Sequence, residues 1–200
     1  MTAKKEASIW RLVIVLTSIA LIAGLALTGV YALTKGPIEK GQKEKKEKAL
    51  QAVLPDYQGT VRDTVIVDAD NEEIPVHLAI GENGELCGAG IETYTKKAFA
   101  GRFDLMVGFD STGTIVNTEV LKAGETPGLG DKINKNKSEF ANQFNHQNPA
   151  DFQLVVKKDG GDVDAITAAT ISSRAYCDAV QRAYDIFMKI KDLVMKCLLP

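Results

Sequence analysis

The sequence predicts an α+β domain with an antiparallel sheet, joined to one N-terminal transmembrane helix. Three observations support this class: an uncharged apolar run near the N-terminus, five segments with strand character after it, and a long helical pattern at the C-terminus. At 200 residues the chain has room for one ordinary domain and an accessory segment. A multidomain enzyme is therefore excluded.

The first element is the apolar run, which holds 22 residues without a charge over 12–33. A hydrocarbon core needs about 20 residues of helix. Trp10 and Tyr31 stand near its ends, where amphipathic rings favour the membrane interface. A cleaved signal peptide is the alternative, but its apolar core runs only about 7 to 15 residues. We expect a retained transmembrane helix over 12–33, preceded by a cytoplasmic N-terminus over 1–11.

The charges around this run leave its orientation open. Basic residues lie on both sides, at Lys4, Lys5 and Arg11 before it and at Lys35, Lys40, Lys43, Lys45, Lys46 and Lys48 after it. By the positive-inside rule alone, the bulk of the protein would be cytoplasmic, although long domains translocate largely regardless of charge.

The next element is a stalk helix over 34–55. Glu39 with Lys43 and Glu44 with Lys48 are spaced for i,i+4 ion pairs, and Pro55 closes the apolar end of the segment. The remaining residues, 56–200, form the predicted domain.

Strands follow, and two turn signals join them into hairpins. Asn83-Gly84 and the turn at 111–113 are both typical of hairpin loops. The predicted strands cover 61–67, 74–80, 86–94, 105–109 and 114–121. After them we expect a short helix over 132–144, a strand over 152–157 and a long helix from about Ser173. Apolar positions keep helical spacing in the last helix, at Val180, Ala183, Phe187, Ile190 and Val194.

Charge and cysteine content exclude several classes of site. The formal net charge of -2 supplies no positive field for nucleic acid, so we expect no nucleic-acid partner. The three Cys form no C-x-x-C, and the two His are far apart, so we expect neither a disulfide framework nor a protein-bound metal. Cys177 and Cys197 are expected to be core or interface thiols. His77 is expected to face solvent or a neighbouring strand.

The most informative segment is 161–174, GDVDAITAATISSR, where hydroxyl side chains crowd the start of the last helix. The first turn of a helix presents free backbone N–H groups that suit a phosphate. Ser and Thr are also the usual N-cap residues. The residues alone therefore leave a phosphate site and plain capping both open.

The stretch from Asp164 to Thr170, DAITAAT, resembles the D-x-x-[ST]-G-A-T motif of FMN-binding domains. The resemblance implies that a flavin transferase esterifies Thr170 with the phosphate of FMN, and that the catalytic chemistry belongs to the flavin. Ala168 stands where Gly is usual. We interpret this as one added methyl group, which needs space in the loop and leaves the chemistry of the motif unchanged. The residues implied to surround the attached FMN are Asp164, Thr167, Ala169, Ser172 and Ser173.

A second segment, ETPGLG over 125–130, resembles the loop that lies against the flavin ring in the same family. Its implied cofactor contacts are Glu125, Thr126, Gly128, Leu129 and Gly130. The turn AFAGR at 98–102 departs from the Gly-rich turn that relatives often carry, which puts the flavin-edge contacts there in doubt. Glu92, Lys157 and Lys158 could approach the flavin, with surface roles equally open.

Over nearly its full length the chain resembles the G subunit of the Rnf electron-transport complex. This implies an electron-transfer subunit with covalent FMN and no independent catalysis, in a membrane complex that couples ferredoxin and NAD oxidation-reduction to ion transport. The implied partners are other subunits, a flavin transferase and the lipid bilayer. The implied location is the inner membrane, with the domain on the extracytoplasmic side.

Three alternatives remain at this point. The C subunit of the sodium-translocating NADH:quinone reductase shares both motifs but is generally longer. A single-span extracytoplasmic binding or sensor module would use the Ser/Thr turn only as a cap. A stand-alone flavin reductase would need a dinucleotide fingerprint, and the chain has no G-x-G-x-x-G.

Overall fold

The structure is a computed structural model that describes residues 9–68 and 70–198. It divides into two units, 1–45 and 46–200. Helix α1, Ile9–Val53, runs through the first unit and ends in the second. It contains the stretch that is apolar and long enough to cross a membrane, and no second one occurs in the described ranges. The predicted transmembrane and stalk helices are thus one helix that passes through Pro37, and the domain boundaries within it remain predictions.

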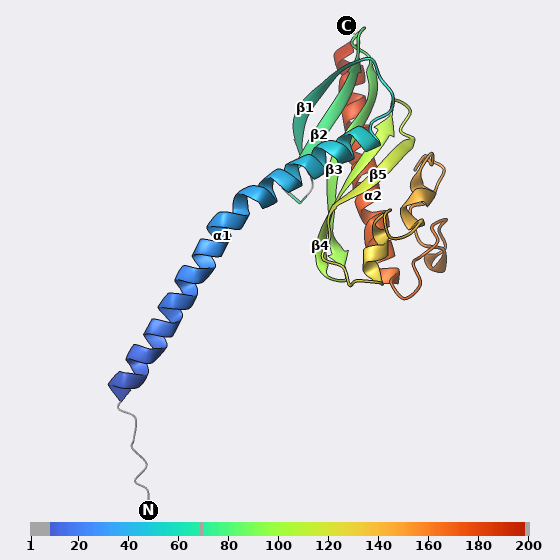
Figure 1. Ribbon diagram of the computed structural model, residues 1–200. Coiled ribbons are helices and arrows are strands. Elements are labelled where there is room, and N and C mark those ends of the chain that lie inside the picture. Colours follow the sequence, from blue (N-terminus) through green and yellow to red (C-terminus); the bar gives the residue numbers. More distant parts are fainter. Residues whose placement is uncertain (1–8, 69, 199–200) are drawn as a thin grey trace, which may run out of the picture. The chain divides into compact units, whose positions relative to one another are not determined.

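The second unit is built on one antiparallel sheet whose strands follow each other in chain order (Figure 1). The strands are β1 (Gly59–Val67), β2 (Glu73–Gly81), β3 (Leu86–Ala98), β4 (Gly101–Asp110) and β5 (Ile115–Lys122). All five predicted strands and both predicted hairpin turns are confirmed. β3 and β4 extend further than predicted, to a tight turn over 99–100, because Ala98 still pairs with Gly101.

Helix α2, Thr170–Leu198, covers one face of the sheet and contacts mainly β3. Its buried stripe includes Val180, Ala183, Phe187 and Ile190, as the helical spacing predicts. Phe187 stacks on Phe109 of β4 with ring centroids 5.1 Å apart. The predicted core position Val194 and the thiol of Cys197 lie outside the residues whose side chains are described.

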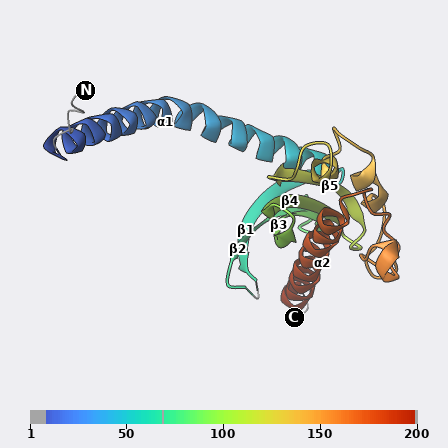
Figure 2. The same ribbon diagram turned by 90° about the horizontal axis from the view of Figure 1, so that it is seen from below.

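The last turns of α1 pack on the opposite face of the sheet (Figure 2). Ala49 and Val53 are buried there against Met106 of β4. Gly108 makes this approach possible, because a Cβ at this position would lie 1.7 Å from the carbonyl oxygen of Val53. Gly90 has a similar role, since its Cβ would lie 2.9 Å from Leu50 Cδ1. Glycines on two strands thus form the groove that receives the end of α1.

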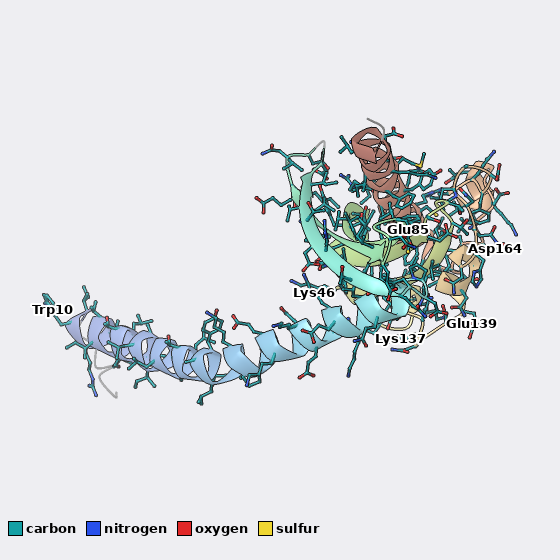
Figure 3. The ribbon with its side chains drawn as sticks, turned by 90° about the horizontal axis from the view of Figure 1, so that it is seen from above. Trp10, Lys46, Glu85, Lys137, Glu139 and Asp164 are labelled. Atoms are coloured by element: carbon teal, nitrogen blue, oxygen red, sulfur yellow. The ribbon has the colours of Figure 1, made fainter. Side chains whose placement is uncertain are left out.

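A charged cluster lies on the same face as the end of α1. The Nζ of Lys46, labelled in Figure 3, lies 2.6 Å from Glu92 Oε2. His77 lies between two carboxylates, with Nδ1 2.7 Å from Asp63 Oδ1 and Nε2 3.5 Å from Glu92 Oε1. The cross-strand position expected for His77 is confirmed, because Asp63 is its register partner on β1.

This cluster makes the stability of the domain depend on pH. The hydrogen bond to Glu92, and then that to Asp63, raises the pKa of His77 above 6.5, its ordinary value. Burial alone would raise the pKa of Glu92, but hydrogen bonds from His77 and Lys46 bring it below its usual range, so this carboxylate is charged. The stabilisation is fully present below about pH 6.5 and is lost as pH rises through the folded-state pKa of His77.

We expect the free energy of unfolding to fall over that window in the full chain and to stay flat in His77→Gln, which cannot titrate. Urea unfolding in detergent at a series of pH values measures both. Equal slopes for the two proteins would show that His77 does not carry the dependence.

Two predictions for the segment between the sheet and α2 are wrong. Instead of one helix over 132–144 there are two short 3-10 helices, η1 (Gly130–Ile133) and η2 (Phe140–Phe144). Ser138 separates them, because its hydroxyl donates to the carbonyl of Lys132 and accepts from the N–H of Phe140. The predicted strand over 152–157 is absent, and one bridge from Val156 to Val163 stands in its place. Leu154 and Val156 are buried in this segment, whereas Val155 is 42% exposed.

Candidate functional site

The DAITAAT segment leads directly into α2, which begins three residues earlier than predicted, at Thr170. The carbonyl of Ala169 accepts from the N–H of Ser173 at 3.0 Å, so the N–H groups of Thr170, Ile171 and Ser172 have no partner within the helix. The buried hydroxyl of Ser173 shapes the turn before it, accepting from the N–H of Ile166 at 2.9 Å. The half-buried Thr170 hydroxyl therefore stands among free backbone donors.

Ala168 adopts the left-handed conformation, with φ of 62°. A Cβ in this region costs roughly 1–2 kcal/mol, which explains why glycine suits the position. The side chain of Ala168 is exposed, so the loop has room for its methyl group. The left-handed backbone is a further reason for glycine that the sequence pattern did not indicate.

Glu125 joins three segments at this place. It is 7% exposed, and its Oε1 accepts from the N–H of Ala100 at 3.0 Å. Its Oε2 accepts from the hydroxyl of Ser172. Gly130 leaves space for this pair, because a Cβ there would lie 2.3 Å from Glu125 Oε2. The carboxylate thus fixes the ETPGLG loop to α2 and to the turn between β3 and β4.

These segments enclose a cavity of about 330 Å³. Most of the predicted site residues line it: Glu125, Thr126, Leu129, Gly130, Ala169, Thr170 and Ser172. The others do not. Asp164 is exposed and lies 2.7 Å from Lys157 Nζ, Thr167 is exposed, and Ser173 is buried. Gly128 donates its N–H to Asp131 Oδ1 at 2.8 Å and turns the loop with φ of 78°.

Phe99 and Ile171 line the cavity without having been predicted to do so. They are 68% and 48% exposed, so both offer apolar surface at the cavity. Phe99 could have been predicted from the sequence, because it is an aromatic residue in the AFAGR turn, which differs from the Gly-rich turn of relatives. Glu92, by contrast, lies on the other face of the sheet with Lys46 and His77, away from the cavity.

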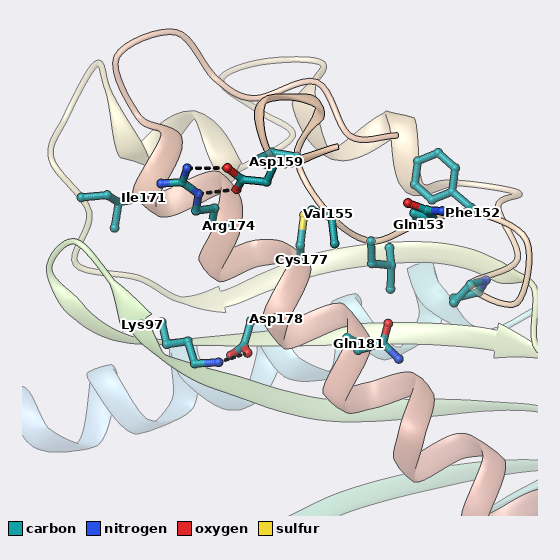
Figure 4. A pocket seen from close by; sticks show the side chains of 13 residues that line it. Lys97, Phe152, Gln153, Val155, Asp159, Ile171, Arg174, Cys177, Asp178 and Gln181 are labelled. Carbon is teal, nitrogen blue, oxygen red and sulfur yellow. Dashed lines mark hydrogen bonds and ion pairs between the residues drawn. The ribbon is translucent and has the colours of Figure 1, made fainter. Parts of the chain in front are cut away.

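A second, larger cavity of about 720 Å³ lies on the other side of Ile171 (Figure 4). Its charged groups are already paired. Arg174 binds Asp159 with two hydrogen bonds of 2.7 and 2.8 Å, and Lys97 Nζ lies 2.5 Å from Asp178 Oδ1. Cys177 is buried there, and burial raises the pKa of its thiol to about 12. Cys177 is therefore a protonated core thiol, as expected.

Comparison with known proteins shows the family to which the chain belongs. Residues 99–185 match the FMN-binding domain family. The chain is 36% identical to the G subunit of the ion-translocating oxidoreductase complex of Shewanella amazonensis, over 84% of this chain and 83% of that one. It is also 36% identical to the G subunit of Aliivibrio fischeri, over 92% and 90%. The chain belongs to the family of G subunits of ion-translocating oxidoreductase complexes. The resemblance inferred from the two motifs is confirmed.

Among solved structures, NqrC of Shewanella oneidensis matches this member of the G-subunit family with a TM-score of 0.44 and 19% identity, over 68% of this chain and 67% of that one. In the described part of the chain, no group of three or more His, Cys, Asp or Glu is placed to hold a metal ion.

The cavity fits FMN in chemistry. The Thr170 hydroxyl and the free N–H groups of the first helical turn suit a phosphate. Phe99, Leu129 and Ile171 offer apolar surface at the cavity, which suits a flat aromatic ring. In this member of the G-subunit family, both parts of the cofactor thus find matching residues on one cavity.

Proposed function

We propose that this protein is an electron-transfer subunit of an ion-translocating oxidoreductase complex and that FMN is esterified through its phosphate to Thr170. The observation that carries the proposal is the position of the Thr170 hydroxyl, on the first turn of α2 and at the wall of a cavity with apolar sides. Membership of the G-subunit family supports the complex, and the FMN-binding domain supports the cofactor.

Each part of the site has its own role in this proposal. The N–H groups of Ile171 and Ser172 receive the phosphate charge at the helix N-terminus. Leu129 and Phe99 contact the ring and reduce its exposure to water, and Glu125 keeps the two walls of the cavity together. The bound flavin supplies one- and two-electron transfer. The chain itself adds binding and orientation rather than a separate reaction.

Attachment would be the work of a flavin transferase acting on an exposed segment. Asp164 and Thr167 are exposed and lie outside the cavity, so another protein can contact them from solvent. We assign these two residues to recognition during maturation and not to contact with the flavin. Thr126 and Ala169 remain cavity-wall residues in this assignment.

The function is tested by the intact mass of the protein purified from its native host. A gain equal to one esterified FMN is expected. A single-span binding or sensor module, the alternative, would show the unmodified mass and no flavin absorbance.

For location we propose a single span over 12–33 in the inner membrane, with the domain on the extracytoplasmic side and partners among the other subunits. The apolar part of α1 and the membrane-complex relatives support the span, and the family resemblance supports the side. A reporter enzyme that is active only outside the cytoplasm is expected to work when fused after Pro200. Activity of a cytoplasm-only reporter there would contradict this orientation.

Leu129→Asp is expected to lower the midpoint potential of the flavin. Leu129 is 43% exposed at the cavity, and a carboxylate in its place disfavours the added negative charge of the reduced ring. A tenfold change in a one-electron equilibrium is about 59 mV, so redox titration of the flavin band measures a shift of that order. Leu129→Asn, which has the same shape as the aspartate variant without the charge, is expected to shift it less. Equal shifts would show that charge at the ring is not the cause.

A further inference from the structure

We propose that β1 is the surface on which another subunit of the complex docks, by adding an extended segment to the open edge of the sheet. β1 stands first in the strand order, and β2 is its one neighbour among the described strands. The proposal rests on the proposed function only in that the protein works within a complex of several subunits.

The outer backbone groups of β1 can be assigned from its register. Pairing with β2 is continuous from Gly59 opposite Gly81 to Val67 opposite Glu73. Just beyond the two ends of β1, the N–H of Glu82 donates to the carbonyl of Gln58 at 3.1 Å, and the N–H of Asp68 donates to the carbonyl of Glu72 at 3.0 Å. Antiparallel pairs alternate, so the even-numbered residues of β1 bond to β2. The N–H and C=O groups that point outward therefore belong to the odd-numbered residues, Gly59, Val61, Asp63, Val65 and Val67.

β1 lacks most of the features that protect an edge strand. Strands at sheet edges are usually protected by proline, bulges, short length or several charges. β1 has nine residues, no proline and no register shift, and its two charged residues are Arg62 and Asp63. The opposite edge shows the contrast, because Ile115 of β5 is bonded to Gln147 at 2.9 Å and to His146 at 2.7 Å. The start of the β5 edge is thus bonded to a later segment of its own chain, whereas β1 has no such backbone bond on its outer edge within the described residues.

The side chains of β1 indicate what kind of segment fits. Every residue of β1 except Ile66 is exposed, and Val65 and Val67 are each 56% exposed. Val61, Val65 and Val67 lie on one face, which favours a segment with β-branched residues at every second position. Arg62, on the other face, forms no ion pair within the described ranges, whereas Asp63 is bonded to His77. The matching segment therefore carries an acidic residue opposite Arg62.

A second copy of this chain fits less well than a different subunit. When two copies of β1 pair antiparallel about a two-fold axis, each side chain meets one from its own face of the sheet. Arg62 and Asp63 lie on opposite faces, so no such register pairs them. Centring the pair on Asp63 places two carboxylates opposite each other.

The test uses the full chain, affinity-tagged and expressed with its complex. Val65→Pro removes one outward N–H and leaves the bonds to β2, because proline is accepted where the N–H faces away from the neighbouring strand. Val65→Thr keeps that N–H and is the matched control. We expect recovery of the other subunits with the tagged chain to fall about tenfold for Val65→Pro and to be unchanged for Val65→Thr. Thermal unfolding and flavin content are expected to be the same in both variants.

Hydrogen exchange gives a second measurement that does not depend on a variant. In the isolated chain in detergent, the amides of Val61, Asp63, Val65 and Val67 should exchange fast, and in the assembled complex they should be protected. Fast exchange at these amides in the complex, or equal recovery of subunits with Val65→Pro, would overturn the proposal. A dimer of the isolated chain that Val65→Pro dissociates would also overturn it, in favour of a second copy. A chain that docks through β1 without flavin supports the docking and contradicts only the proposed function.

Discussion

The Thr170→Val variant is expected to fold and to carry no covalent flavin. Valine keeps the branched shape of threonine and lacks the hydroxyl that the phosphoester requires. Thr170 is half-buried on the first helical turn, and its hydroxyl has no hydrogen bond with any described residue that would be lost, so the free energy of unfolding should change by less than about 1 kcal/mol. Flavin fluorescence of the band on a denaturing gel, together with intact mass, measures the attachment.

Thr170→Ser is the matched control, because it keeps a hydroxyl at the same place on the helix. It is expected to retain flavin, at a level that depends on how the transferase accepts serine. A fluorescent band in Thr170→Val would show that another hydroxyl is the acceptor. The neighbouring Thr167 would then be the first residue to replace.

Gly108→Ala is expected to lower the free energy of unfolding of the domain by about 1–3 kcal/mol. The added methyl group would lie 1.7 Å from the carbonyl oxygen of Val53 and 2.8 Å from its Cβ, and a backbone carbonyl cannot move aside as a flexible side chain can. The end of α1 must therefore lift from β4, which exposes Met106 and Val53 to water. Urea unfolding of the full chain in detergent measures the loss.

Gly124→Ala provides the control for this comparison. Its Cβ would meet nothing closer than Ala100 Cβ at 3.9 Å, and its backbone has no positive φ. The expected change is within about 0.5 kcal/mol. If the two variants unfold alike, the packing of the α1 end contributes little to the stability of the domain.

The elements that could be predicted from the sequence are those that local residue patterns determine. Alternation of apolar residues and the turn at Asn83-Gly84 predicted the sheet, because strand faces and hairpin loops are set by neighbouring residues. The single helix predicted over 132–144 is wrong, because the hydroxyl of Ser138 bonds to the backbone between the two short helices. It donates to the carbonyl of Lys132 and accepts from the N–H of Phe140.

At the candidate site, the two motifs predicted which segments would meet but not what joins them. Glu125 was expected to contact the cofactor; it lines the cavity and also bonds Ser172 and the turn at Ala100, which the motif did not indicate. The contact with Ala100 joins residues that are 25 positions apart in the sequence, and the contact with Ser172 joins residues that are 47 positions apart. No periodicity or spacing rule covers such pairs, since they depend on how β3, β4 and α2 pack together.

Pro37, inside α1, limits how far the proposed span can reach. Proline has no N–H, so the carbonyl of Leu33, four residues earlier, receives no hydrogen bond from the helix. An unsatisfied carbonyl in hydrocarbon costs several kcal/mol, whereas water at the lipid headgroups satisfies it without loss. An end of the hydrocarbon at or before Leu33 avoids this cost, whereas a deeper position of Pro37 needs a neighbouring helix, a side chain or water to satisfy the carbonyl. A missing amide proton thus favours an end of the proposed span at the residue where the uncharged run ends.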